Sequence, residues 1–279
     1  MEARVFAGPA AARGPETYAE HVARLGSLPS GSAARDVIPV LESSGLLGRG
    51  GAGFPVGRKW RSVADQTGGR PIVLANGAEG EPLSAKDRTL LRLRPHLVLD
   101  GALLAADAVG ADSIVVYVGT EHRDALASLR QAIRERDGRD GRGGRGGGPD
   151  PFAIEVLEAP ATYVAGEESA AVHFVNDADA RPTNTPPRPY ERGISGRPTL
   201  VQNVESLAQA ALIGRFGDAW YRELGRDETP GSALVTISGS PRDGVREVEI
   251  GTTIGELAEL SGAGPDPRDR QAVLLGGYF

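Results

Sequence analysis

The spacing of apolar residues changes several times along the chain, and each change predicts a different element. Helical spacing covers residues 35–47 and 201–216, and residues 121–136 have the pattern of an amphipathic helix. Residues 88–110 predict a helix that is interrupted at Pro95, because proline has no N–H to donate. Apolar runs predict three strands, at residues 71–77, 113–120 and 152–160. This alternation of strands and helices is typical of an α/β fold.

The remaining segments of this region have weaker patterns. Residues 1–30 predict a ragged segment with one short helix, residues 60–66 a helix start, and residues 162–175 a loop that enters a helix. The proline-rich stretch 181–199 excludes a helix or a central strand. The Gly- and Arg-rich stretch 137–150 resembles RGG segments that bind nucleic acid, but it is a single short tract without aromatic residues, which favours a flexible surface loop.

The pattern changes again at Pro230. Residues 232–240, 246–253 and 254–264 predict strand, turn, strand and helix, which indicates a small β-grasp-like unit. The sequence stops in the hydrophobic run LLGGYF, and we interpret this last unit as incomplete. The expected organisation is an N-terminal segment at 1–34, an α/β domain at 35–229 and the small unit at 230–279.

Composition narrows the function classes. The 279 residues are 40% hydrophobic and 24% charged, as in soluble globular proteins, and the net charge of −6 argues against a general nucleic-acid binder. No apolar run has the length of a membrane span and the start has no signal-peptide pattern, so we expect a cytoplasmic protein that meets a membrane only through partners.

Metal chemistry is not expected from this sequence. It has no cysteine, which excludes disulfides, thiolate metal sites and an iron–sulfur cluster ligated by this chain. Its four histidines do not lie at metal-ligand spacing.

Lysine is rare in this chain. Of 31 basic residues only Lys59 and Lys86 are lysines. A lysine offers a compact ammonium on a flexible stem, which arginine cannot replace at every site. Lys59 lies in a glycine-rich run and is therefore a candidate functional residue, whereas chance explains Lys86 equally well.

That glycine-rich run, GRGGAGFPVGRKW at 48–60, combines backbone freedom with positive charge. Gly48, Gly50 and Gly53 match the dinucleotide pattern G-x-G-x-x-G, but the preceding residues predict a helix rather than the strand that a standard Rossmann site requires. Consecutive glycines still let backbone N–H groups approach an anion, and Arg49, Arg58 and Lys59 add charge for a phosphate. The alternative is a structural turn with a solvated basic edge.

Four acidic residues accompany this run. Glu79 and Glu81 follow the first predicted strand in NGAEGEP, and Glu167 and Glu168 lie in YVAGEES at a helix start. Acidic side chains at a helix start often serve only as caps. Because both segments follow strands, where α/β sheets form their ligand crevice, we expect the four acids to face the basic loop and bind a polar, phosphate-bearing cofactor.

Three segments in this order, GRGGAGFPVGRKW, NGAEGEPLSAKDR and YVAGEES…GRPTLVQNVESL, resemble the FMN- and NADH-binding flavoprotein subunit of respiratory complex I (NADH:quinone oxidoreductase), which has relatives in NAD-linked hydrogenases and formate dehydrogenases. The last unit resembles the ubiquitin-like SLBB domain of that family. The resemblance covers roughly residues 40–279 and implies a Rossmann-like FMN-binding domain, with FMN as cofactor, NADH as substrate and an iron–sulfur electron-transfer protein as partner.

The resemblance also implies roles for matching residues. The loop residues and Lys59 would hold the FMN phosphate and ribityl chain, Asn76 and Glu79 would contact the flavin, and residues 163–168 would line the ring and nicotinamide side, with Glu168 holding the nicotinamide. Phe54 would stack on the NADH adenine and Glu81 would bind a ribose hydroxyl. The full FMN set is Gly48, Arg49, Gly50, Gly51, Lys59, Asn76, Glu79, Tyr163, Gly166, Glu167, Glu168, Val201, Gln202 and Asn203.

Several positions depart from the family pattern. Ala78 stands where the family has an aspartate, and Ser62 where it has an aromatic residue. Thr185 and Arg188 occupy the places of a lysine and a phenylalanine, and Ala165 that of a cysteine. The family's cysteine-bearing domain is not in this sequence. Loss of one aromatic contact costs about 1 kcal/mol.

Two alternative functions therefore stand beside that of an NADH-oxidising subunit. One is a non-catalytic FMN-binding or structural paralogue with a degraded NADH site, and the other is a phosphate-binding module for another nucleotide.

Overall fold

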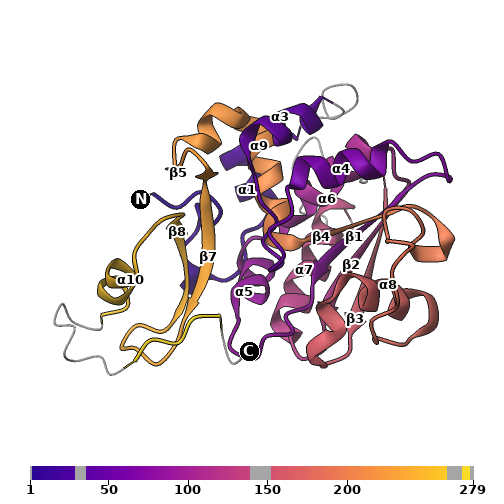
Figure 1. The fold of residues 1–279 in the computed structure, drawn as a ribbon. Helices are drawn as coiled ribbons and strands as arrows, with labels where there is room; N and C mark the ends of the chain where they lie inside the picture. The colour runs from indigo at the N-terminus through magenta and orange to yellow at the C-terminus, as the bar shows by residue number, and fades with distance from the viewer. Residues whose placement is uncertain (1, 29–35, 139–151, 263–271, 277–279) are drawn as a thin grey trace.

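A four-stranded parallel sheet is the centre of the molecule (Figure 1). The computed structural model describes residues 2–28, 36–138, 152–262 and 272–276. The strands are β1 (Ile72–Gly77), β2 (Ser113–Gly119), β3 (Ala153–Ala159) and β4 (Thr199–Asn203), in the spatial order β3-β2-β1-β4. The predicted α/β class is confirmed.

The order of the strands defines where a ligand crevice forms. The chain steps from β1 to β2 and β3 on one side and then returns to place β4 on the other side of β1. In open α/β sheets, ligands bind outside the carboxyl ends of the strands at such a reversal. Asn76 near the end of β1 pairs in register with Asn203 at the end of β4, so these two residues mark the crevice.

Helices cover both faces of the sheet. One face packs with buried residues of α3 (Val37–Ser44), α4 (Val56–Ala64), α5 (Lys86–Leu93), α6 (Pro95–Val109), α7 (Arg123–Arg136) and α9 (Val204–Arg222). The other face packs against α8 (Glu168–Asp177) and Ile194, in the short 3-10 helix η3 (Ile194–Gly196). β1 and β2 are therefore almost fully buried, as expected of central parallel strands.

The helix predictions agree with the structure in most places. The break at Pro95 is confirmed, since α5 ends at Leu93 and α6 begins at Pro95. α4 begins at Val56, four residues before the expected start, so it follows directly on the glycine run. The N-terminal segment contains the expected short helix, α1 (Tyr18–Leu25), after a single 3-10 turn, η1 (Ala11–Arg13).

One prediction was wrong. Residues 201–203 were expected to begin a helix, but β4 covers Thr199–Asn203. The helical spacing of α9 begins only at Val204, and the preceding residues instead pair with β1 from Ile72↔Thr199 to Asn76↔Asn203. Because β4 is at the edge of the sheet, the proline at 198 is tolerated just before it.

The C-terminal residues form the predicted strand, turn, strand and helix. β7 (Ser232–Ile237) pairs antiparallel with β8 (Gly244–Glu249), and α10 (Ile254–Leu260) follows. A second, two-residue pair, β5 (Gly225–Arg226) and β6 (Thr229–Pro230), precedes them. The carboxylate of Glu247 in β8 accepts the backbone N–H groups of Arg4, Val5 and Phe6, so the N-terminal segment is anchored to this hairpin.

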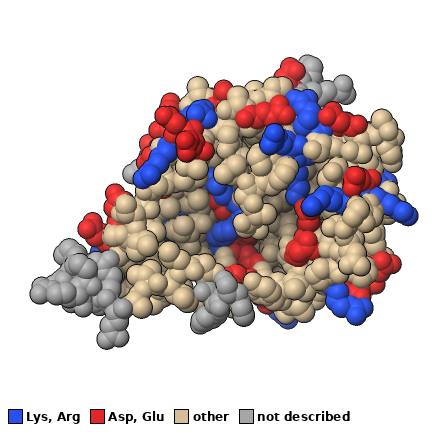
Figure 2. All heavy atoms as spheres, in the orientation of Figure 1, with Lys and Arg blue, Asp and Glu red and all other residues tan. Residues whose placement is uncertain are grey.

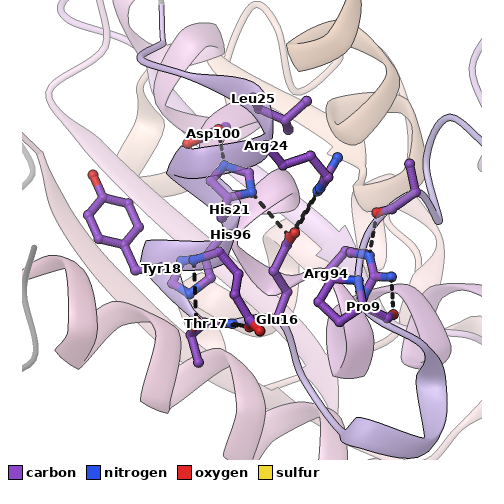
Figure 3. A network of polar contacts seen from close by, with 12 residues as sticks. Pro9, Glu16, Thr17, Tyr18, His21, Arg24, Leu25, Arg94, His96 and Asp100 are labelled. Atoms are coloured by element: carbon purple, nitrogen blue, oxygen red, sulfur yellow. Dashed lines mark hydrogen bonds and ion pairs between the residues drawn. The ribbon is translucent and has the colours of Figure 1, made fainter.

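A buried network of charged groups fixes α1 to the domain (Figure 3). The His21 ring bridges Glu16 and Asp100, at 3.3 and 2.6 Å. Asp100 also accepts hydrogen bonds from Arg136 and Arg215, each at 2.5 Å. His21 comes from α1, Asp100 from α6, and Glu16 from the loop between η1 and α1. This network therefore joins the N-terminal segment to the core.

Two expectations lie wholly or partly outside what the structure describes. Of the predicted surface loop at 137–150, residues 139–150 are not described, and of LLGGYF at the end of the chain only residues 274–276 are. Among the described helices, none combines the length and the apolar character that crossing a bilayer requires.

Candidate functional site

The glycine run forms a closed loop at the edge of the sheet. Leu47 and Pro55 pair as an isolated bridge, Gly48 N–H donates to the Phe54 carbonyl at 2.9 Å, and Val56 N–H donates to the Leu46 carbonyl at 3.0 Å. α3 precedes the loop and α4 follows it. The rejection of a standard Rossmann site is therefore confirmed, because a helix and not a strand leads into the glycines.

The loop lies against the start of α9. Arg49 N–H donates to the Ser206 hydroxyl at 2.8 Å, and a Cβ on Gly50 would lie 3.3 Å from the Asn203 Cβ. Asn203 caps α9, since its Oδ1 accepts N–H groups of Glu205 and Ser206. Glycine-loop amides and the N-terminus of α9, which is regular up to a kink at Gly217, thus meet at one place, which is the arrangement that favours an anion.

α4 carries the first lysine into the site. Lys59 Nζ lies 2.7 Å from Glu168 Oε2, in the first turn of α8. The next residue, Trp60, is fully buried, and its indole N–H donates to Gln202 Oε1 at 3.3 Å. Burial of Trp60 beside β4 therefore fixes the direction in which Lys59 points.

Two loops after β1 and β3 touch through their backbones. Asn76 Nδ2 donates to the Gly166 carbonyl at 2.8 Å. A Cβ on Gly80 would lie 2.0 Å from the Tyr163 carbonyl oxygen, and one on Gly166 would lie 2.7 Å from the Ala78 carbonyl oxygen. No side chain fits at either position without moving the backbone, so glycine is required there for the loops to meet.

The four acidic residues have different surroundings. Glu79 accepts hydrogen bonds from the Ser84 hydroxyl at 2.6 Å and from Arg88 N–H at 3.0 Å. Glu167 caps α8 by accepting the N–H groups of Ser169 and Ala170. Glu81 is half-buried in the same loop as Glu79. Glu168 forms an ion pair with Lys59, the lysine of the glycine-rich run.

Some predicted residues point elsewhere. The guanidinium of Arg49 donates to the Tyr221 hydroxyl and the Ser232 carbonyl, and its Nε lies 3.9 Å from Glu205 Oε1 in the first turn of α9, so this side chain is engaged within the protein. Arg58 is exposed. Val201 is 3% exposed and packs in the core on the α8 side of the sheet.

Several residues expected to contact the cofactor ring or NADH lie at the surface. Phe54, expected to stack on the NADH adenine, is 52% exposed, and Tyr163, expected to line the flavin ring, is 56% exposed. Thr185 and Arg188 are also exposed. The hydroxyl of Ser62, where an aromatic was expected, donates to the Arg58 carbonyl one turn earlier in α4.

Sequence reasoning missed a buried charge cluster beside the loop. Lys86 Nζ lies 2.8 Å from Asp87 Oδ1 and 3.0 Å from Glu205 Oε2, and Asp87 Oδ2 accepts from Asn203 Nδ2 at 2.7 Å. Burial alone would lower the pKa of Lys86, but the two carboxylates raise it, so the ammonium stays charged. Burial raises the pKa of Asp87 against the opposing effect of Lys86. The rarity of lysine in the sequence was the one feature that could have pointed to Lys86.

The surface around the site is hollowed. Figure 2 shows a hollow near the middle of the drawn face that contains both acidic and basic side chains. A separate cavity of about 430 Å³ lies on the outer side of α8, away from the glycine loop. Its lining includes Ser169, Val172, His173, Asn176, Asp177, Thr183, Asn184, Pro187, Pro189, Arg192, Gly193 and Gly196. Within the described part of the chain, no three His, Asp or Glu side chains are placed to hold a metal ion.

The donor groups fit a long anionic ligand with hydroxyl groups. The glycine cradle and the α9 N-terminus place backbone amides at one end, and Gly50 lies so close to Asn203 that an added Cβ would displace its neighbour by a few tenths of an ångström. Lys59, Glu168 and Asn76 offer charged and amide groups further along the crevice. Such a set suits a phosphate at one end and hydroxyl or ring N–H groups beyond it.

Comparison with known proteins identifies similar chains. Residues 41–211 match the family described as the Nuo51 FMN-binding domain. The chain is 36% identical over 245 residues to an NADH-quinone oxidoreductase subunit of Rhizobium meliloti (strain 1021), covering 87% of this chain and 58% of that protein. It is 37% identical over 245 residues to "NAD-reducing hydrogenase HoxS subunit alpha" of Cupriavidus necator (strain ATCC 17699 / DSM 428 / KCTC 22496 / NCIMB 10442 / H16 / Stanier 337), covering 86% of this chain and 40% of that protein.

The fold is also similar to a solved structure. The crystal structure of an NAD+-reducing [NiFe]-hydrogenase in the air-oxidized state matches with a TM-score of 0.74 and 34% identity, over 84% of this chain and 40% of that chain. The chain thus spans about half the length of the relatives it matches. The family-matched range 41–211 contains every predicted site residue.

Proposed function

The chain belongs to the Nuo51 FMN-binding domain family, and from that premise we propose that it is an FMN-binding oxidoreductase subunit that accepts hydride from NADH and passes electrons to a partner. The observation that carries this proposal is the meeting of the glycine loop, the α9 N-terminus, Asn76 and the Lys59–Glu168 pair at the reversal between β1 and β4. The general rule for open α/β sheets places a cofactor at that reversal.

The phosphate of FMN would lie at the glycine loop and the α9 N-terminus. The amides of Gly50 and Gly51 and the positive end of the α9 dipole would face it, with Gln202 and Asn203 at the end of β4 shaping the floor. The N–H groups of Gly48, Arg49, Glu205 and Ser206 already donate within the protein. Lys59 would lie further along the cofactor, because its ammonium is 2.7 Å from Glu168 and not beside Asn203's cap. It would therefore hold the ribityl chain or the ring rather than the terminal phosphate.

The ring would lie over the loops that follow β1 and β3. Asn76 and Gly166, joined at 2.8 Å, would form one side, with Glu79, Tyr163 and Glu167 nearby in the same two loops. When bound, FMN supplies the hydride acceptor and the change from two-electron to one-electron transfer. Glu168 would orient the nicotinamide, and the exposed Phe54 with the half-buried Glu81 would bind the adenosine half of NADH.

We also propose a domain assignment. Residues 35–229 would form the FMN- and NADH-binding domain, residues 1–34 an N-terminal segment, and residues 230–279 an SLBB-type unit, for which β7, β8 and α10 provide the strand, strand and helix. Cysteine thiolates hold iron–sulfur clusters and these 279 residues contain no cysteine, so we propose that the electrons pass to a cluster held outside this sequence, on an electron-transfer partner. The multi-subunit relatives named above are consistent with such a partner.

A second candidate function has its own support. At Ser62, Thr185 and Arg188 the chain lacks the aromatic and basic groups expected at the NADH clamp, and the Ser62 hydroxyl bonds to its own helix. These residues favour a paralogue that binds FMN without oxidising NADH. Purified protein reconstituted with FMN and mixed anaerobically with NADH separates the two: bleaching of the flavin bands supports the NADH-oxidising subunit, and retained bands support the paralogue.

A further inference from the structure

The second lysine of the chain belongs to a cluster that no part of the proposed function uses. Lys86 and Asp87 begin α5, and Glu205 lies in the first turn of α9. Asp87 is 3% exposed and Glu205 is 1% exposed, and the Lys86 ammonium lies within 3.0 Å of a carboxylate oxygen of each. The two buried carboxylates share this ammonium, and Arg49 Nε lies 3.9 Å from Glu205 Oε1, so each carboxylate has a basic group nearby, which is the condition under which buried charge is tolerated.

The cluster reaches the proposed cofactor site through one side chain. Asn203 Oδ1 caps α9, and Asn203 Nδ2 donates to Asp87 Oδ2 at 2.7 Å. The oxygen and the nitrogen of the Asn203 side-chain amide are therefore both hydrogen-bonded, and the bond to Asp87 fixes the orientation in which Asn203 caps α9. A Cβ built on Gly50 would lie 3.3 Å from the Asn203 Cβ, so Asn203 borders the glycine loop as well as capping α9.

Asp87 itself is held firmly in place. Lys86 binds its second oxygen at 2.8 Å. Glu205, which shares the ammonium, accepts Leu234 N–H of β7 at 2.8 Å through its other oxygen. The carboxylate that orients Asn203 is thus supported from α5, α9 and the C-terminal hairpin together.

We propose that Asp87 is a positioning residue for the phosphate end of the cofactor site and acts through Asn203. The proposal rests on the proposed function, since it takes FMN as the ligand. Asp87 touches no reacting group; it keeps Asn203 in its capping orientation, and so keeps the start of α9 and the glycine loop beside it in the shape that would hold the phosphate. Lys86 supports it by pairing with both Asp87 and Glu205.

The test compares FMN with riboflavin, which lacks the phosphate. Dissociation constants of both are measured by quenching of flavin fluorescence, for wild type, Asp87→Ala, Asn203→Ala and the double variant. We expect Asp87→Ala to weaken FMN at least tenfold and to change riboflavin less than twofold. A residue with a merely structural role would weaken both ligands alike. We also expect the double variant to be no weaker than Asn203→Ala, because residues that act through one another are not additive.

Asp112→Ala is the matched control. Asp112 pairs with Arg197 at 2.5 Å at the opposite end of the strands, and its loss should leave the ratio of the two dissociation constants unchanged. Equal effects of Asp87→Ala on FMN and riboflavin, or multiplied effects in the double variant, would overturn the inference. If Asp87→Ala does not fold, the ratio of the FMN and riboflavin dissociation constants is measured for Asp87→Asn and Asn203→Ala instead. A ratio equal to that of wild type in both variants overturns the inference. A wild type that binds neither flavin refutes the proposed function as well.

Discussion

Lys59 Nζ lies 2.7 Å from Glu168 Oε2, so residues 109 positions apart in the sequence form an ion pair across the crevice of the sheet. Lys59 comes from α4, directly after the glycine loop, and Glu168 from the first turn of α8. Each side chain is partly exposed, at 25% and 30%. Both groups therefore reach the same point of the proposed site and are accessible to a ligand there.

Lys59→Ala is expected to weaken FMN binding. A hydrogen bond to a charged group contributes about 1.5–3 kcal/mol, so the dissociation constant should rise roughly 10- to 150-fold. The measurement is a flavin fluorescence titration. Arg61→Ala is the control, since Arg61 lies on the same helix and pairs with Glu42 at 3.1 Å on the exposed side. Unchanged flavin affinity in Lys59→Ala would remove the lysine from the cofactor site.

Glu168→Gln is expected to impair NADH oxidation while FMN stays bound. The amide keeps the size of the side chain but loses the charge that pairs with Lys59 and would orient the nicotinamide. Stopped-flow bleaching of the flavin by NADH should slow at least tenfold, which corresponds to about 1.4 kcal/mol of barrier. Glu158→Gln, an exposed pair with Arg130, serves as control. Equal bleaching rates in Glu168→Gln and wild type would contradict this role.

Gly80→Ala and Gly166→Ala are each expected to destabilise the protein by about 1–3 kcal/mol, because the added methyl group overlaps the backbone of the facing loop. Both should also reduce FMN occupancy. Urea unfolding gives the first quantity and bound flavin absorbance the second. At Gly68 the nearest atom would be 3.7 Å from an added Cβ, so Gly68→Ala should behave like wild type. A wild-type stability for Gly80→Ala would mean that the loops do not pack as described.

Asp100→Ala is expected to cost about 3–5 kcal/mol, since it leaves Arg136 and Arg215 buried without their shared carboxylate. The change is far from the crevice, so FMN affinity in the folded fraction should be retained. Denaturant unfolding followed by tryptophan fluorescence measures the loss. A loss below about 1 kcal/mol would show that the network in Figure 3 contributes little to stability.

Stability should fall in acid. Burial alone would raise the pKa of Glu16, but hydrogen bonds from His21 and Arg24 lower it to about 2 from 4.5. A hydrogen bond from His96 lowers the pKa of Glu135 to about 2 from 4.5. Carboxylates with a lowered pKa stabilise the fold fully above pH 4.5 and lose this effect as the pH falls toward 2. The urea concentration at the unfolding midpoint, measured between about pH 6 and 2.5, follows this loss of stability. Glu135→Gln should reduce the dependence of that midpoint on pH.

Much of the fold could be predicted from the sequence, because most of its signals are local. The break at Pro95, the buried strand at 113–120 and the strand–turn–strand–helix after Pro230 depend on periodicity and on proline and glycine positions. β4 could not be predicted, since its five residues become a strand only by pairing with β1, far away in sequence. Tertiary pairing overrides local propensity in such short segments.

The candidate site was predictable in its membership but not in its geometry. The sequence motifs predicted that Lys59, Asn76 and Glu168 belong to one site, and the family-matched range 41–211 includes all three. They could not show that Glu79 and Glu167 accept local backbone hydrogen bonds, that the Arg49 guanidinium turns toward β7, or that Asp87 holds Asn203. These contacts depend on side-chain directions that spacing does not encode.

The most direct test of the central claim is the visible absorption spectrum of the purified protein with FMN, before and after anaerobic addition of NADH. The account predicts bound flavin bands that bleach when NADH is added, with electrons then available to an added acceptor. A protein that shows no flavin bands even with excess FMN would contradict the assignment of the crevice between β1 and β4 as a flavin site.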